Sequence, residues 1–324
     1  MIDLRAASSA IIVAAGLVSV LPALANDSSA SIVAGGVVLG TTDAVRIASE
    51  GLYVSAERID VDYVFENITD RDVTVQMAFP LPDVDARNVY GTWPEQAEST
   101  RFINFATSID GRPVVTREIV EIIGADGRPI TDIFRREGFP LAPYSSAWGD
   151  DIETGTPEAE ARMARLAELG LLSADGRPDW TTRISFVWEA IFPARRTVEV
   201  SHSYKPVAGS FFFTPEVDNF ESWYRARYCA SAGEWRSLNR VAGRKQEYRL
   251  ISEVGYALKP GANWAGPIGR FHLTLDKGHP KNLITLCFKG DLKKTAPTRF
   301  EFEAFDYTPR EDILFAIMNT TIGD

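Results

Sequence analysis

Four side chains late in the chain are of the types that recognise sugars and anions, namely Asn263, Trp264, Arg270 and Lys277. They occur in the Gly- and Pro-rich stretch PGANWAGPIGRFHLTLDKG, residues 260–278. An indole offers a flat apolar face, whereas amide, guanidinium and ammonium groups offer directional hydrogen-bond donors. We therefore predict that these residues form a ligand-binding site on a loop of a rigid scaffold. The alternative is that Trp264 lies under the loop and holds it against the scaffold.

Metal and catalytic chemistry find little support in the sequence. The histidines are His202, His272 and His279, and no two of them have the spacing of metal ligands on one element. A zinc site needs three or four converging ligands, so we predict no metal site. The Gly-x-Ser-x-Gly elbow, the P-loop, the dinucleotide fingerprint and the EF-hand spacing do not occur in the sequence. With 44 acidic residues, a pair of carboxylates for glycoside cleavage can always be found, so the pair indicates nothing. We predict no catalytic residues and no cofactor.

The net charge limits the classes of partner. The formal charge is −10, and Lys and Arg do not cluster into a basic stripe. Nucleic-acid binding needs clustered cations that neutralise phosphates, so we expect no nucleic-acid partner. Nor do we expect attraction to anionic lipid by charge alone.

The N-terminus predicts export, and export in turn determines whether the two cysteines are expected to form a disulfide. The apolar run at 10–21 has the length of a signal-peptide core, and the Ala-Leu-Ala sequence at 23–25 fits a cleavage site. The alternative is a buried core helix. We expect residues 1–25 to be removed and the mature protein to be periplasmic or secreted, because no later run is long enough to span a membrane. In an oxidising compartment Cys229 and Cys287 are expected to form a disulfide; the alternative is two buried thiols.

The elements that position these side chains are predicted to be mainly strands. The stretch VDYVFENITDRDVTVQMAFPLPD, residues 61–83, alternates apolar and polar residues twice around a polar break and ends at prolines. Period-two alternation indicates half-buried strands, and Asn and Asp favour turns. We predict a β-hairpin here and a second long hairpin from TRISFVWEAIFP and RTVEVSHSYKP. Further strands are expected at GSFFF, EYRLISEVGYAL, RFHLTLDKG, NLITLCFKG and TRFEFEAFDYTP.

Turns and helices complete the pattern. The tetrapeptide DGRP occurs at Asp110, Asp126 and Asp175, and Asp-Gly favours tight surface turns. Residues 156–172 begin with a Thr-Pro cap and carry apolar residues at helical spacing, which predicts an inserted helix packed on the sheets. EWRSLNRVAG and PREDILFAIM are expected to form short helices, the second closing the chain. The predicted fold is mainly β: antiparallel β-sandwiches with an inserted helix and a short C-terminal helix.

Two family resemblances follow from these motifs. VDYVFENITDRDVTVQMAFPLPDVDARNV, IDGRPVVTREIVEI and VEVSHSYKPVAGSFFF resemble the vault/inter-α-trypsin (VIT) type of β-sandwich, over about residues 39–213. NDSSASIVAGGVVL, FPLPD, WEAIFPA, YCASAGEW and NWAGPIGRFHLTLDKG with LITLCF resemble a bacterial secreted family known as domain of unknown function 4424. That resemblance implies a periplasmic or secreted β-rich protein and transfers no catalytic residue. We expect a VIT-like sandwich at 26–215 and a second β-rich part packed on it at 216–324.

The expected function is that of a non-enzymatic exported protein that binds a ligand or another envelope component, with an envelope protein or a glycan as partner. The rival hypothesis is a periplasmic hydrolase acting on glycan or peptide, and a third is a structural subunit of an envelope complex. An enzyme should show a cavity with converging titratable groups of perturbed pKa, whereas a binding module should show an apolar or aromatic surface with polar neighbours.

Overall fold

The computed structural model describes residues 28–33, 36–89, 94–207, 209–243 and 249–320; the expected signal peptide at 1–25 lies outside them. The strands are β1 (Ser28–Val33), β2 (Gly36–Gly40), β3 (Val45–Val54), β4 (Ile59–Asn67), β5 (Val73–Pro80), β6 (Val84–Asp85), β7 (Ala106–Ile109), β8 (Arg112–Pro113), β9 (Arg117–Gly124), β10 (Trp180–Phe192), β11 (Thr197–Tyr204), β12 (Gly209–Phe213), β13 (Arg249–Tyr256), β14 (Ile268–Asp276), β15 (Leu283–Cys287), β16 (Lys293–Lys294), β17 (Arg299–Tyr307) and β18 (Ile313–Met318). The helices are α1 (Thr131–Glu137), α2 (Asp150–Thr154), α3 (Pro157–Glu168), α4 (Phe220–Arg227) and α5 (Ala232–Ala242), with short 3-10 turns η1 (Ala86–Asn88), η2 (Ser146–Trp148) and η3 (Lys259–Asn263).

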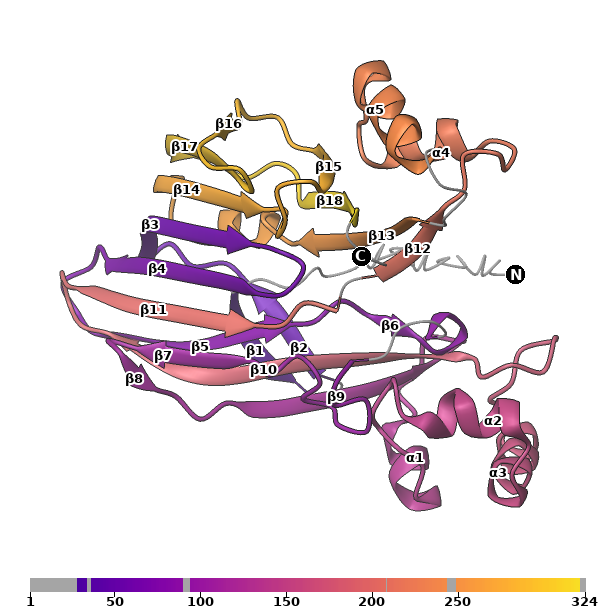
Figure 1. The fold of residues 1–324 in the computed structure, drawn as a ribbon. Coiled ribbons are helices and arrows are strands. Elements are labelled where there is room, and N and C mark those ends of the chain that lie inside the picture. The colour runs from indigo at the N-terminus through magenta and orange to yellow at the C-terminus, as the bar shows by residue number, and fades with distance from the viewer. Residues whose placement is uncertain (1–27, 34–35, 90–93, 208, 244–248, 321–324) are drawn as a thin grey trace, which may run out of the picture.

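These strands build three sheets, which confirms the mainly β fold (Figure 1). A six-stranded sheet runs in the order β2-β1-β5-β10-β6, with β9 also paired to β10, and an eight-stranded sheet runs β16-β17-β14-β3-β4-β11-β7-β8. A four-stranded sheet, β12-β13-β18-β15, lies beside α4 and α5. Within the described residues, neighbouring strands are antiparallel except β3 and β14, which are parallel.

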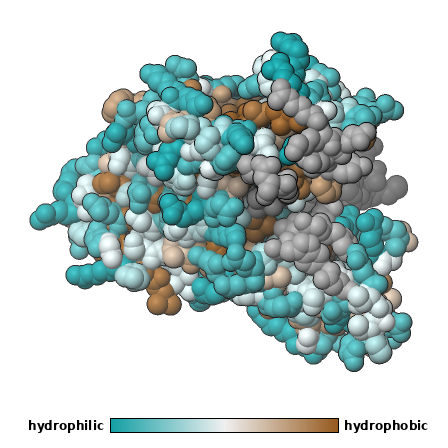
Figure 2. Space-filling model, in the orientation of Figure 1, coloured by the Kyte–Doolittle hydropathy of each residue, from teal (hydrophilic) through white to brown (hydrophobic). Residues whose placement is uncertain are grey.

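The hydrophobic core lies between the two larger sheets. At alternate positions of β4 and β5 lie Tyr63, Phe65, Met77 and Phe79, which are each at most 2% exposed and belong to one apolar cluster. Each such side chain contributes about 1.5–3 kcal/mol on burial, so the predicted alternation stabilises the packing of the two layers. On the face shown in Figure 2, hydrophilic residues dominate and hydrophobic ones gather in small separate areas.

The prediction of a first hairpin was wrong. β4 pairs with β3 and β11 in the eight-stranded sheet, whereas β5 pairs with β1 and β10 in the six-stranded sheet. The connection at 68–72 is therefore an arch from one layer to the other. The alternation misled because it shows which side chains face the core and says nothing about which strand lies alongside. Two strands facing the core from opposite layers have the same pattern as two strands of one hairpin.

The second predicted hairpin is also an arch. β10 lies in the six-stranded sheet and β11 in the eight-stranded sheet. The two arches are hydrogen bonded to each other: Asn67 N donates to Arg196 O over 3.0 Å, and Arg195 N donates to Thr69 O over 3.2 Å. The polar residues that looked like hairpin turns thus join the two layers at one end of the sandwich.

The predicted C-terminal helix is a strand. β18 lies between β13 and β15 in the four-stranded sheet, and most of its side chains are buried. Ile313 and Ile317 are β-branched, and six residues with apolar side chains on both faces suit a central strand. Tertiary packing therefore overrides the helical appearance of the preceding Pro-Arg-Glu-Asp.

The inserted helix is confirmed as α3. Thr156 caps it by accepting from Ala159 N, a proline occupies its first turn, and Gly170 follows it with a positive φ of 69°. α3 packs with α1 and η2 around Phe134 and Trp148. In Figure 1 this group lies on the opposite side of the molecule from α4 and α5.

The three DGRP turns are confirmed as well. Their glycines, Gly111, Gly127 and Gly176, have φ values of 73°, 80° and 76°, which favour glycine. β14, β16 and β17 from the proposed second part complete the eight-stranded sheet, whereas β13, β15 and β18 form most of the small one. The division at residue 215 stays a prediction. No helix in the described ranges is long and apolar enough to cross a membrane.

Candidate functional site

Trp264 lies in the core and not on a binding surface. Its side chain is 4% exposed, and its ring centroid lies 4.5 Å from that of Phe65 and 6.5 Å from that of Phe192. The backbone beside it is fixed too, because Asn263 O accepts from Thr42 N over 3.0 Å. The structure therefore shows the alternative interpretation, in which the indole anchors the loop to the sandwich.

Arg270 and Lys277 lie far from each other, and unlike Trp264 neither belongs to the apolar core. Arg270 is exposed on the outer face of β14, where its Nε donates to Glu303 over 2.6 Å. Lys277 is 7% exposed, and its Nζ donates to the carbonyls of Pro280 and Asn282 over 2.7 and 2.6 Å. Burial lowers the pKa of Lys277. Seven extended residues span roughly 20 Å, so the four predicted side chains do not meet in one site.

The predicted disulfide is present between Cys229 and Cys287, whose Cα atoms lie 5.0 Å apart. It joins the segment between α4 and α5 to β15 of the four-stranded sheet. The two helices are thereby fixed to the sheet that they cover.

A cleft of about 630 Å³ lies between the six-stranded sheet and the four-stranded sheet, and Tyr204 of β11 adds a residue from the eight-stranded sheet. Its walls are largely apolar: Leu81, Phe102, Tyr144, Tyr204 and Ile313 line it. Burial raises the pKa of Tyr144 to about 12, so this phenol stays neutral at ordinary pH. Binding sites for small ligands are typically concavities of this size with apolar walls and a few polar groups.

Charged groups border the cleft in pairs. Glu253 accepts from Arg227 over 2.6 and 2.8 Å and from the hydroxyl of Tyr228. Burial tends to raise the pKa of Glu253, but the hydrogen bonds from Arg227 and Tyr228 outweigh it and hold the pKa below its usual range. The hydrogen bond from Arg87 is the main cause of the lowered pKa of Asp85. Both carboxylates are thereby held as anions.

Two more carboxylates on the cleft lining are also paired. Asp83 lies 3.0 Å from the Nε of Arg183, and Asp312 lies 2.8 Å from the Nζ of Lys259. Such pairs fix the geometry of the rim and offer hydrogen-bond acceptors to a ligand.

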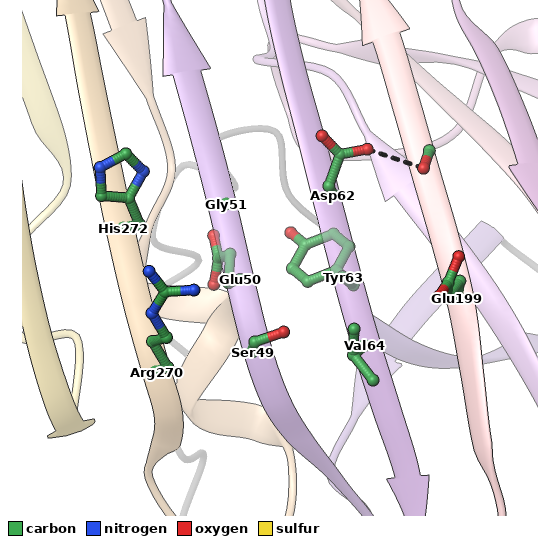
Figure 3. Close-up of a pocket in the computed structure, with 10 residues that line it drawn as sticks. Ser49, Glu50, Gly51, Asp62, Tyr63, Val64, Glu199, Arg270 and His272 are labelled. Carbon is green, nitrogen blue, oxygen red and sulfur yellow. Dashed lines mark hydrogen bonds between the residues drawn. The ribbon is translucent and has the colours of Figure 1, made fainter.

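The second cavity is a hollow of about 390 Å³ on the outer face of the eight-stranded sheet (Figure 3). Two rows of side chains cross the sheet there: one joins His272, Gly51, Asp62 and Ser201, and the next joins Arg270, Ser49, Val64 and Glu199. Gly51 has no side chain, so it forms the floor between β14 and β4. Ser201 Oγ donates to Asp62 over 2.7 Å.

The hollow does not contain a catalytic triad. His272 and Ser201 lie in the same row but three strands apart, which is about 14 Å and beyond hydrogen-bond reach. Within the described residues, no three His, Cys, Asp or Glu side chains gather closely enough to hold a metal ion.

Sequence reasoning missed the cleft almost entirely. Phe102, Tyr144, Tyr204 and Glu253 come from distant segments that only the topology brings together. The one useful indication was the FPLP sequence, because its Leu81 and the following proline line the cleft. For the hollow, the indication was Arg270, the predicted site residue that does border a cavity.

Comparison with known proteins places the chain in a family but does not identify a ligand. No curated protein matches it. A crystal structure described as a "putative nutrient binding protein" from Legionella pneumophila is 13% identical, covers 91% of this chain and 71% of that chain, and superposes with a TM-score of 0.42. The family described as "Domain of unknown function (DUF4424)" matches residues 25–315. The chain belongs to the DUF4424 family.

Proposed function

We propose that this protein is an exported, non-enzymatic binding protein whose cleft takes an amphiphilic small molecule, such as a short peptide or a glycan with an apolar group. The observation that carries the proposal is the cleft itself. Phe102 and Tyr204 are 4% and 6% exposed and give it rigid apolar walls, while the paired carboxylates give it a polar rim. A ligand with an apolar body and hydrogen-bonding ends matches both parts.

The rival function, hydrolysis of glycan or peptide, fits the cleft less well. The pKa values of Glu253 and Asp85 are lowered, whereas a catalytic acid needs a raised one. No histidine lines the cleft among the described residues. Tyr144 is held neutral at ordinary pH, so it can donate a hydrogen bond to a ligand but does not supply a base.

Export is part of the proposal. It is supported by the signal-like N-terminus and by the disulfide, because disulfides persist in oxidising compartments. The VIT-type resemblance of residues 39–213 likewise stays a proposal, supported by the sandwich and its FPLP sequence. An envelope protein as partner is retained as the alternative occupant of the cleft.

The test uses a pair of strand glycines, one in each cavity. A Cβ added at Gly255, on the cleft wall, would have its nearest neighbours at 3.8 and 3.9 Å, and a Cβ at Gly51, in the hollow, would have the same two distances. Phenylalanine should therefore fit either backbone while filling only its own cavity. We would purify the mature protein and both variants from the envelope fraction and record native mass spectra.

We expect the wild type and Gly51→Phe to carry the same small-molecule adduct and to bind the apolar dye Nile red, and Gly255→Phe to lose both. A cleft without adduct or dye in the wild type, or an adduct kept by Gly255→Phe, would overturn the proposal. Turnover of a peptide or glycan library by the wild type but not by Gly255→Phe would favour the hydrolase instead.

A further inference from the structure

The hollow on the outer sheet face has walls of opposite charge. Arg270 and His272 project from β14 on one side, and Asp62 on β4 and Glu199 on β11 lie on the other. Gly51 on β3 lies between them and adds no side chain. Strands are rigid supports, so this separation of charge is fixed by the sheet and not by a mobile loop.

The charged groups of the two walls differ in whether they already have an ion-pair partner. Within the described part of the chain, Asp62 and Glu199 have no ion-pair partner, and Asp62 accepts only the hydroxyl of Ser201. Arg270, in contrast, is paired with Glu303 on β17. That bond uses Nε, and a guanidinium has five N–H donors, so Arg270 can still donate to a second acceptor.

We propose that the hollow binds a free amino acid, with the ligand ammonium between Asp62 and Glu199 and the ligand carboxylate at Arg270. His272 borders the same end and donates a second hydrogen bond to the carboxylate. This site is independent of the cleft and of the ligand proposed for it. The acidic wall is the stronger one, because its two carboxylates face one guanidinium.

The register of the strands limits the length of the ligand. Arg270 and Asp62 lie two strand spacings apart, about 10 Å, and two residues apart along the strands, about 7 Å, so about 12 Å separates their Cα atoms. The long Arg270 side chain can lean toward Gly51 and shorten this gap, so a ligand of a few atoms with a charge-assisted hydrogen bond of about 2.8 Å at each end reaches both groups. An amino acid is such a ligand, whereas a dipeptide places its charges about 3.5 Å further apart.

The charge balance sets an order of preference. The lining carries three carboxylates, Glu50, Asp62 and Glu199, and one guanidinium, Arg270, so negative charge is in excess. A basic amino acid adds a positive charge and an acidic one adds a negative charge. Lysine should therefore bind more tightly than alanine, and alanine more tightly than glutamate.

Two aspartates on β4 give a matched pair of variants. Asp62 accepts from Ser201 over 2.7 Å inside the hollow, and Asp60 accepts from Ser203 over 2.7 Å in the adjacent row outside it. Asp62→Asn and Asp60→Asn each remove one negative charge from the same face of one strand, although Asp60 also pairs with Arg58 over 2.6 Å. Only the first should affect binding.

The experiment is isothermal titration calorimetry on the full mature chain with L-lysine, L-alanine, L-glutamate, N-acetyl-L-alanine and L-alaninamide. We expect lysine to bind most tightly and each capped alanine to bind at least tenfold more weakly than alanine. Asp62→Asn should weaken lysine binding about tenfold or more, while Asp60→Asn should leave it within twofold. Gly51→Phe should abolish binding, and Gly255→Phe should retain it.

Equal effects of the two asparagine variants would overturn the proposal, as would binding of alaninamide as tight as that of alanine. The same conclusion follows if glutamate matches lysine or if no amino acid binds. Loss of binding in Gly255→Phe with retention in Gly51→Phe would assign the amino acid to the cleft and refute the hollow as its site. Circular dichroism of each variant checks that it is folded.

Discussion

Replacing Asn67 by alanine should lower the free energy of unfolding by about 3 kcal/mol. Its amide nitrogen donates to Phe192 O over 2.7 Å and to Arg71 O over 2.8 Å, and its side-chain oxygen accepts from Thr69 N and from Thr69 Oγ1. Asn67 is 0% exposed, and it joins the arch after β4 to the end of β10. Its side chain therefore joins the two layers at the end of the sandwich where the two arches are hydrogen bonded to each other.

The magnitude follows from what the deletion leaves behind. The bond to Phe192 O is buried, so the orphaned carbonyl costs about 1–3 kcal/mol. The other three bonds lie nearer to the solvent, where water can replace them, and each contributes about 0.5 kcal/mol. Adding these three contributions to about 1.5–2 kcal/mol for the buried bond gives the expected loss of about 3 kcal/mol.

Urea unfolding followed by circular dichroism measures this change, and Thr69→Ala is the control. That variant removes the hydroxyl donor to Asn67 but leaves the bond to Phe192 intact, so it should cost less than about 1 kcal/mol. Asn67→Asp keeps the acceptor, loses the donor and buries a charge, so it should destabilise at least as much as alanine. If Asn67→Ala proves no more costly than Thr69→Ala, the idea that this side chain holds the arches is refuted.

Two further predictions concern the four-stranded sheet and its helices. Removing the disulfide by Cys229→Ser with Cys287→Ser should cost up to about 4 kcal/mol in urea unfolding, the loop-closure value for a separation of 58 residues; an unchanged midpoint would contradict this. Glu253 has a pKa lowered in the folded state, so its stabilisation is present above the unfolded value and is lost as the pH falls through the folded one. The melting temperature should therefore fall below about pH 4, and Glu253→Gln should show a smaller fall than the wild type in thermal scans at several pH values.

The sequence was a good guide to individual strands and a poor guide to their partners. Alternation identified β4, β5, β10 and β11 because apolar faces must be buried whichever layer a strand joins. Pairing depends on contacts between distant segments, such as β3 with β14, and no local pattern encodes that contact. The same limit explains β18, whose place in the centre of a sheet overrides the helical preference of the residues before it.

The candidate sites were hard to predict for a related reason. The indole of Trp264 could stack on a ligand, but it is also the largest apolar surface in its loop. In the structure this surface is buried in the core and is not exposed to a ligand. The cysteine pair was predictable because the export expected from the N-terminal sequence makes a disulfide the usual state of two cysteines. The cleft was not predictable, because its lining is assembled from segments of three sheets.

Glycines within strands are the local feature that points to both cavities. A strand glycine loses packing and conformational entropy, so it needs a reason. At Gly269 the reason is steric, because an added Cβ would lie 2.5 Å from Ala48 O at the bulge between Ile47 and Ser49. At Gly51 and Gly255 no atom approaches an added Cβ within 3.8 Å, so the backbone does not require glycine. Because glycine has no side chain, it leaves open space at these two positions. Gly51 borders the hollow and Gly255 borders the cleft. Filling that space is therefore the most direct way to learn what either cavity holds.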